Sequence, residues 1–171
     1  MSVREAPPSA GLSPLAAFGV VGLVLGASAI LGRRNAPDAS HPDIRRWYRR
    51  LDKPDYTPSD AVFGAVWPVL DAGLAVGGYR LLRRPAGTIR NAAVGLWLIN
   101  TALIGGWTEL FFRQRRLGTG AVVSGTMIVT GTAYVATAGK VDRATAALGA
   151  PLVAWLGFAT LLAEQIRQRN K

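Results

Sequence analysis

Apolar and charged residues are sharply separated along this chain. Four long runs contain no charged residue, at 6–32, 91–108, 117–139 and 144–163, and a fifth, at 61–79, is interrupted only by Asp71. Each run approaches or exceeds the roughly 20 residues that a helix needs to cross about 30 Å of hydrocarbon. We therefore predict an all-α, integral membrane, five-transmembrane-helix bundle, with spans at about 15–32, 61–80, 91–112, 117–139 and 144–164.

The polar segments between these runs predict how the helices follow one another. The connections at 80–89, 113–116 and 140–143 are short, so neighbouring helices should lie antiparallel. The 33–60 segment is the longest polar stretch. Three prolines with Ser and Gly make 1–14 a disordered N-terminal lead-in. The predicted organisation is this lead-in, a membrane domain at 15–165 and a basic C-terminal tail at 166–171.

The net charge of +10 accompanies a positive mean hydropathy, which is typical of a membrane protein with basic loops. Assigning Lys and Arg to the two sides of the five spans gives seven on the side of the N-terminus and thirteen on the other. Because cytoplasmic loops are enriched in Lys and Arg, we expect the N-terminus outside and the C-terminus in the cytoplasm, in a bacterial cytoplasmic membrane. Anionic lipids then account for the basic loops, and nucleic-acid binding is not needed.

A cleaved signal peptide is the alternative for the first run, since Ala27-Ser28-Ala29 has the small-x-small form of a cleavage site. Against it, Arg4 and Glu5 make a poor positive leader, and the apolar run is long. The chain has no cysteine, which excludes disulfides and thiol chemistry. Its single His41 lies in a polar loop without partner ligands, so we expect no metal site.

Three pairs of small residues, each four positions apart, lie in the predicted spans and would let helix backbones approach closely. Such pairs serve either packing within the bundle or a homodimer face. They are Gly22 and Gly26, Gly73 and Gly77, and Ala102 and Gly106.

Aromatic and polar residues share helix faces within the spans. Five tryptophans lie near the spans, and a membrane-interface belt is the first explanation for them. Helical spacing suggests a second explanation, in which these residues line an inward-facing cavity. The pairs and groups with that spacing are Trp67 with Asp71, Asn100 with Trp107, and Trp155 with Phe158 and Ala159.

Asp71 is the sharpest single candidate, because a carboxylate in the middle of a span costs at least about 2.5 kcal/mol and usually faces the bundle interior or water. It is either a titrating or ligand-binding acid or a structural polar residue bonded to a group such as Asn100. No nucleophile–base pair, metal cluster or phosphate-binding loop is recognisable. We therefore predict no catalytic residues and no obligatory cofactor.

Several short motifs lie in the spans and in the long polar segment. They are Trp47-Tyr48, Leu51, Lys53-Pro54, Pro58, Phe63-Gly64, Val66-Trp67, Trp107 with Leu110-Phe111-Phe112, and Pro151 with Trp155, Phe158, Ala159 and Thr160. Together these motifs resemble the TspO/MBR family, the group of tryptophan-rich sensory proteins and translocator proteins also called peripheral benzodiazepine receptors. The resemblance extends over about residues 15–165.

The resemblance implies a five-helix membrane protein, often a homodimer, that binds porphyrins, haem and, in some members, sterols and drug-like ligands. Its pocket would lie among the helices under the first loop. Porphyrin or haem is thus the implied ligand. The pocket or lid residues implied in this chain are Trp47, Tyr48, Trp67, Trp107, Trp155, Phe158 and Ala159.

This chain also departs from the family pattern. Asp71 stands where the family usually has an aromatic residue, and Ile104, Leu152 and Ala163 stand where it has polar or aromatic ones. We do not expect sterol binding, since 161–171 lacks the tyrosine of the proposed sterol motif.

The leading hypothesis is a membrane sensor or translocator that binds planar apolar molecules. The alternatives are a proton-coupled transporter of a small solute that uses Asp71, breakdown of a bound porphyrin, and a structural subunit.

Overall fold

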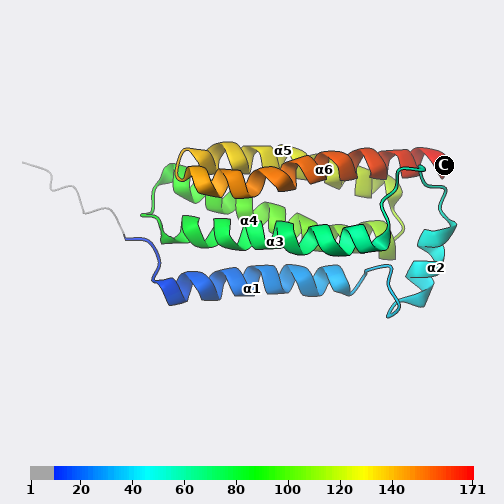
Figure 1. The fold of residues 1–171 in the computed structure, drawn as a ribbon, viewed down its shortest axis with the longest axis horizontal. Coiled ribbons are helices and arrows are strands. Elements are labelled where there is room, and N and C mark those ends of the chain that lie inside the picture. The colour runs from blue at the N-terminus through cyan, green and yellow to red at the C-terminus, as the bar shows by residue number, and fades with distance from the viewer. Residues whose placement is uncertain (1–9) are drawn as a thin grey trace, which may run out of the picture.

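The computed structural model describes residues 10–171, and within this range the chain forms six α-helices and one π-helix. Figure 1 shows five long helices side by side, with the short α2 across one end. The predicted all-α bundle with five apolar helices long enough to span a membrane is confirmed. The helices are α1 (Pro14–Arg33), α2 (Pro42–Arg50), α3 (Asp60–Arg83), α4 (Thr88–Thr108), η1 (Glu109–Arg113), α5 (Leu117–Gly139) and α6 (Arg143–Arg169).

The structure adds helix at two places that the sequence analysis treated as polar connection or tail. Helix α2 lies inside the long polar segment, where Pro42 starts it and Ile44, Trp47, Tyr48 and Leu51 recur with helical spacing. Helix α6 continues through the basic end of the chain to Arg169. Both additions lie at the same end of the bundle, as Figure 1 shows.

The predicted lead-in at 1–14 lies mostly outside the described residues, which begin at residue 10. Ser13 accepts a hydrogen bond from the backbone N–H of Ala16 and so caps α1. The backbone N–H of Leu12 donates to the carbonyl of Leu82 at 2.9 Å. The segment before α1 is therefore held against the C-terminal end of α3.

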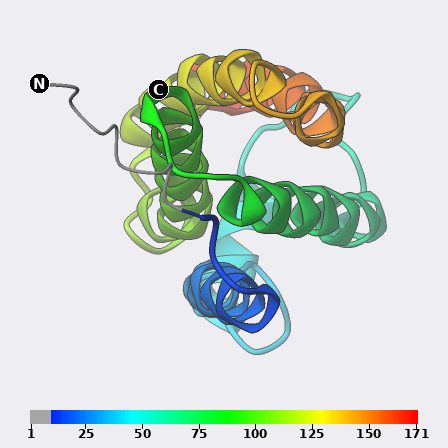
Figure 2. The same ribbon diagram turned by 90° about the vertical axis from the view of Figure 1, so that its left-hand side faces the viewer.

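The long helices pack as neighbours around α3 and α4. Helix α6 contacts α5 and α3, whereas α4 contacts α5 and α1. Figure 2 shows α1 and the α5–α6 pair on opposite sides of α3. Helix α1 fully buries only Ala17 and Val21 and partly buries Val20, Val24 and Leu25 against the core. Its large exposed apolar side chains, which lipid would cover, are Leu15, Phe18, Leu23, Ile30 and Leu31. It is the most peripheral of the five long helices.

Helices α3 and α4 approach each other closely at Trp97, in the centre of the bundle. This indole is fully buried, and its Nε1–H donates to the carbonyl of Leu74 on α3 at 3.0 Å. A Cβ atom at Gly78 would lie 2.6 Å from the Trp97 ring, so only glycine admits the ring against α3. The same bond satisfies a polar N–H that would be expensive to leave unpaired in a membrane.

The small-residue pairs divide between two environments. Gly73 and Gly77 pack inside the bundle, where added Cβ atoms would meet the Leu148 carbonyl and the Tyr134 hydroxyl at 2.7 Å. Added Cβ atoms at Gly22, Gly26 and Gly106 would meet open space. Packing within the bundle therefore accounts for one of the three pairs.

An ion pair between a buried carboxylate and a partly exposed guanidinium group joins α3 to the start of α6. The Asp142 carboxylate accepts two hydrogen bonds from Arg80, at 2.7 and 3.0 Å, and one from the backbone N–H of Ala144, which caps α6. These bonds, led by that from Arg80, hold the pKa of Asp142 at about 2, although burial acts against them. Asp142 is therefore ionised at neutral pH.

We predict that Gly78→Ala lowers the thermal unfolding temperature in detergent by several degrees, because the new methyl group displaces the buried Trp97 ring and strains its bond to Leu74. Gly125→Ala on α5 is the matched control, since its Cβ meets open space, and it should leave the unfolding temperature unchanged or raise it. Equal unfolding temperatures for the two variants would contradict the close-approach argument.

Candidate ligand-binding site

The α2 end of the bundle holds a cluster of aromatic rings built on the end of α4. Trp107 stacks on Phe111 with ring centroids 4.5 Å apart and 18° between the planes, and Phe112 meets both rings edge-on. Trp107 Nε1–H donates to the carbonyl of Gly120 on α5 at 2.9 Å. Aromatic pairs in these geometries stabilise one another beyond the area they bury. The three rings therefore form a rigid platform.

The π-helix η1 places the two phenylalanines of this platform. Its wider turn is closed by the hydrogen bond from the Gln114 N–H to the Glu109 carbonyl at 2.9 Å. The Phe111 ring is buried against Gly120, where a Cβ atom would lie 2.6 Å from it. Single turns of π-helix occur frequently at functional sites. The sequence analysis quoted these phenylalanines only as part of a motif and did not place them in the site.

Helix α2 lies over the platform as a lid. The Trp47 ring contacts Phe111 edge-on at 6.5 Å, and the Tyr48 ring contacts Phe112 perpendicularly at 5.2 Å. Lys53 lies over the Tyr48 ring at 4.7 Å and donates to the Tyr48 carbonyl at 2.7 Å. Burial raises the pKa of the Tyr48 phenol and lowers that of the Lys53 ammonium. The phenol therefore stays protonated at neutral pH.

The loop after the lid is fastened to the C-terminal end of α6. The backbone N–H of Asp52 donates to Asn170 Oδ1 at 3.0 Å, and Asn170 Nδ2 donates back to the Asp52 carbonyl at 2.9 Å. Arg169 adds a weak ion pair to the Asp52 carboxylate at 3.5 Å. Two reciprocal hydrogen bonds on one amide side chain thus tie the loop after α2 to the end of α6.

A second aromatic group lies beside the first, between α3, α6 and the loop. Trp155 contacts Phe63 on α3 at 5.6 Å and Phe158 on its own helix at 5.4 Å, and Tyr56 of the loop contacts Phe158 at 6.3 Å. The Trp155 Nε1 atom is buried and has no hydrogen-bond acceptor among residues 10–171. A buried N–H without an acceptor is a destabilising feature that an acceptor on a ligand would relieve.

Two surface hollows, of about 240 and 430 Å³, lie away from the aromatic groups: one beside Asp142, the other between Gly118 and Arg167 on the outer surface of α5 and α6. Neither is lined by the rings described above.

Comparison with known proteins places this architecture in a family. A sequence model described as the TspO/MBR family matches residues 15–169. The chain belongs to the TspO/MBR family. The human translocator protein is 34% identical over 128 residues, covering 71% of this chain and 73% of the human protein. The bovine translocator protein is 32% identical over 131 residues, covering 74% and 76% of the two chains.

A bacterial relative extends the comparison. The uncharacterized membrane protein YtaB of Bacillus subtilis (strain 168) is 29% identical over 132 residues, covering 75% of this chain and 83% of YtaB. Together with its five long apolar helices, membership in the TspO/MBR family makes this chain an integral, multi-pass membrane protein of the translocator or sensor type.

Four other residues predicted for the site lie outside the two aromatic groups of this TspO/MBR chain, and their ligand contacts stay predictions. Trp67 is half-buried and packs against the bundle core, and Ala159 is half-buried on α6. Asn100 is fully buried, where its Nδ2 donates to the Leu96 carbonyl and its Oδ1 accepts from Thr130 on α5. Such satisfied bonds give Asn100 a packing role between α4 and α5.

Asp71 lacks the structural partner that one interpretation gave it. It is half-buried on α3, and no residue of the described range 10–171 forms a hydrogen bond or an ion pair with its carboxylate. Asn100, the partner considered from the sequence, uses its side chain elsewhere. Within the same range, no cluster of three His, Asp or Glu side chains is placed to hold a metal ion.

We predict that Asn170→Ala loosens the lid, because it removes both hydrogen bonds to Asp52. Each contributes about 1 kcal/mol, so the population with an open loop should rise about tenfold or more. Limited trypsin digestion in detergent measures this as faster cleavage after Arg49 and Arg50. Lys171→Ala, at the exposed C-terminus, is the control and should digest like the wild type. Unchanged cleavage in Asn170→Ala would show that other contacts hold the lid.

Proposed function

We propose that this TspO/MBR protein binds a planar, ring-shaped apolar molecule, such as a porphyrin or haem, between the α2 lid and the two aromatic groups. The observation that carries the proposal is the buried, unpartnered Nε1–H of Trp155 between Phe63 and Phe158. A ligand carboxylate or carbonyl would accept its hydrogen bond, while the ligand ring would stack on the neighbouring side chains.

The route into the site follows from how the lid is held. The lid contacts the platform through ring edges, at Trp47 and Tyr48, and is fastened to α6 mainly through Asn170. These few contacts are exchangeable for contacts with a ligand ring of similar apolar character. Binding then consists of lid opening, insertion against Trp107 and Trp155, and partial reclosure, which removes the ligand from water.

The names of two relatives agree with the proposed function. The human and bovine proteins carry the name translocator protein. In this chain, an outward movement of α2 and its loop would let a bound molecule exchange between the bundle and the water at that end. Sensing and translocation both begin with this binding step, and neither requires a catalytic residue.

We predict that Trp155→Phe weakens protoporphyrin IX binding about five- to tenfold, because the ring is kept while the N–H donor is lost. The dissociation constant is measured by titrating protoporphyrin IX and following the quenching of the remaining tryptophan emission. Phe18→Leu removes an outward-facing ring on α1, which is 71% exposed, and serves as the control. Equal dissociation constants for wild type and Trp155→Phe would remove the support that the unpartnered N–H gives.

Asp71 favours proton-coupled movement as a second candidate function. A half-buried carboxyl group without a protein partner, in the middle of an apolar helix, has both the access and the cost of charging that a proton carrier needs. In this scheme Asp71 takes up a proton on one side and releases it on the other as a solute moves.

We predict that wild-type protein in pyranine-loaded liposomes dissipates an imposed pH gradient faster than empty liposomes, and that Asp71→Asn abolishes the difference. Asp55→Asn, which removes an exposed acid from the loop, is the matched control and should behave like the wild type. A wild-type rate equal to that of empty liposomes would rule out this second function and leave the porphyrin proposal intact.

A further inference from the structure

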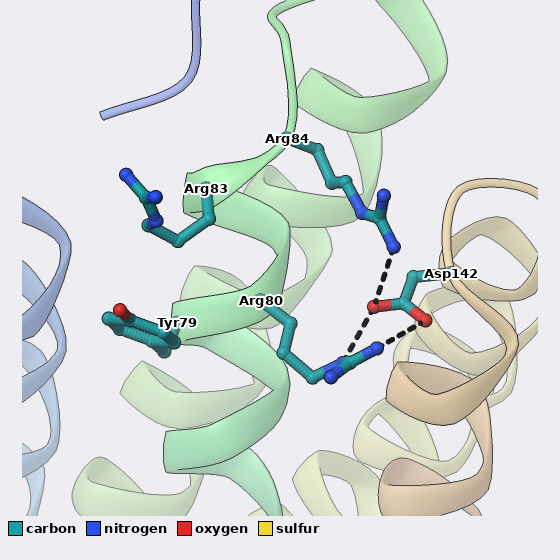
Figure 3. A pocket seen from close by; sticks show the side chains of 5 residues that line it. All are labelled: Tyr79, Arg80, Arg83, Arg84 and Asp142. Atoms are coloured by element: carbon teal, nitrogen blue, oxygen red, sulfur yellow. Dashed lines mark hydrogen bonds and ion pairs between the residues drawn. The ribbon is translucent and has the colours of Figure 1, made fainter. Parts of the chain in front are cut away.

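The end of the bundle opposite the lid carries a basic hollow that the proposed function does not use. It has a volume of about 240 Å³, and Figure 3 shows the side chains that line it. Three guanidinium groups and one carboxylate give this lining an excess of two positive charges. We call it the arginine hollow. Its lining residues are Tyr79, Arg80, Arg83, Arg84 and Asp142.

The single carboxylate of the arginine hollow is already fully bonded. The side chain of Asp142 is only 6% exposed, and its two oxygens accept from Arg80, the Ala144 N–H and the Thr145 hydroxyl. It therefore neutralises Arg80 and fixes its position. Arg84 lies 3.6 Å from the same carboxylate, beyond a good hydrogen bond, and half of its side chain is exposed.

Arg83 keeps its charge available for a ligand. In Figure 3 it points away from Asp142, whereas Arg80 and Arg84 turn toward that carboxylate. Its Nη1 donates to the backbone carbonyl of Leu12 at 2.7 Å, and it forms no ion pair with any residue of the described chain, 10–171. An anion beside Arg83 would thus meet an uncompensated guanidinium group.

The negative end of α3, which would repel an anion, is covered. Arg90 donates to the carbonyls of Leu81 and Leu82, each at 2.9 Å, and the Leu12 N–H also donates to Leu82. These bonds occupy carbonyl groups that a helix C-terminus otherwise leaves open. The exposed groups at this end are therefore mainly cationic.

An apolar track on α3 leads up to the hollow. Val69 and Val76 precede Arg83 at intervals of seven residues, so all three lie on nearly the same helix face. Both valines are largely outward-facing, at 69% and 48% exposed. Tyr79, at the edge of the hollow, is a residue type enriched at membrane interfaces. A molecule that matches this face has long apolar chains attached to an anionic head.

We propose that the arginine hollow binds the headgroup of an anionic phospholipid. The phosphate lies against Arg83 and accepts charge-assisted hydrogen bonds from it, while the rest of the headgroup extends into the hollow toward Arg84. The acyl chains lie along the Val69 and Val76 face of α3. Inorganic phosphate would use only the hollow and gain nothing from this apolar face, which is why the lipid is the favoured occupant.

The test compares lipids on the full-length protein after delipidation in detergent, with bound lipid counted by native mass spectrometry. Phosphatidylglycerol should be retained in preference to phosphatidylcholine with the same acyl chains. Arg83→Gln combined with Arg84→Gln should weaken phosphatidylglycerol binding by about tenfold or more. Arg49→Gln combined with Arg50→Gln removes the same charge from α2, at the other end, and should bind phosphatidylglycerol like the wild type.

Three results would overturn the proposal. Equal retention of the two lipids would show that the headgroup is not recognised, and equal weakening in the α2 variant would show only a diffuse attraction to basic loops. Thermal stabilisation by inorganic phosphate equal to that by phosphatidylglycerol would assign the hollow to free phosphate.

If the double variant unfolds earlier than the wild type without lipid, Arg84→Gln alone replaces it. The Arg84 side chain makes no hydrogen bond to residues 10–171 and is half exposed, so its loss should leave the fold intact. It should weaken phosphatidylglycerol binding about threefold. Wild-type binding by a stable Arg84→Gln would argue against a headgroup that reaches across the hollow.

Discussion

In hydrocarbon every backbone N–H and C=O must find its partner within the protein, and this requirement organises the whole molecule. The five long helices satisfy it along most of their length, with Pro68 in α3 and Pro151 in α6 as the residues that lack an N–H to donate. Non-helical backbone lies at the two ends of the bundle. One end carries the π-helix, the lid and its loop, and the other carries the arginine hollow. Three polar side chains of α4, those of Trp97, Asn100 and Thr101, follow the same rule, since each bonds to a backbone carbonyl, whereas the buried Trp155 N–H does not. The same five helices thus carry aromatic groups at one end and cationic groups at the other.

Much of the architecture was predictable because membrane spans leave a strong mark on the sequence. The five long apolar runs, of which one contains Asp71, located all five long helices to within a few residues at most ends. Helix α2 was not predicted, although its apolar residues have helical spacing, because the many charged residues of the segment indicated a polar connection. The π-helix was not predictable from local pattern. Its Phe111 ring packs against Gly120 of α5, a contact between separate helices that no local sequence pattern shows.

The candidate site shows the same division between local and long-range information. Helical spacing correctly grouped Trp155 with Phe158, since those residues lie on one helix. It also grouped Asn100 with Trp107, yet the structure uses the Asn100 side chain to join α4 and α5. The bonds between Asp52 and Asn170 join residues 118 positions apart and have no sequence signature. Contacts of this range decide which candidate residues meet.

The peripheral position of α1 has a consequence for how the chain is assembled. Transmembrane helices insert one by one and associate afterwards. Helix α1 emerges from the ribosome before α4. The Ser28 hydroxyl on α1 donates a hydrogen bond to the Thr101 carbonyl on α4 at 2.9 Å. The Ser28 backbone also lies within about 3 Å of where a Cβ of Gly105 would be. The Ser28 hydroxyl group therefore gains this interhelical acceptor only after α4 has been synthesised, although α1 also packs against the earlier helix α3.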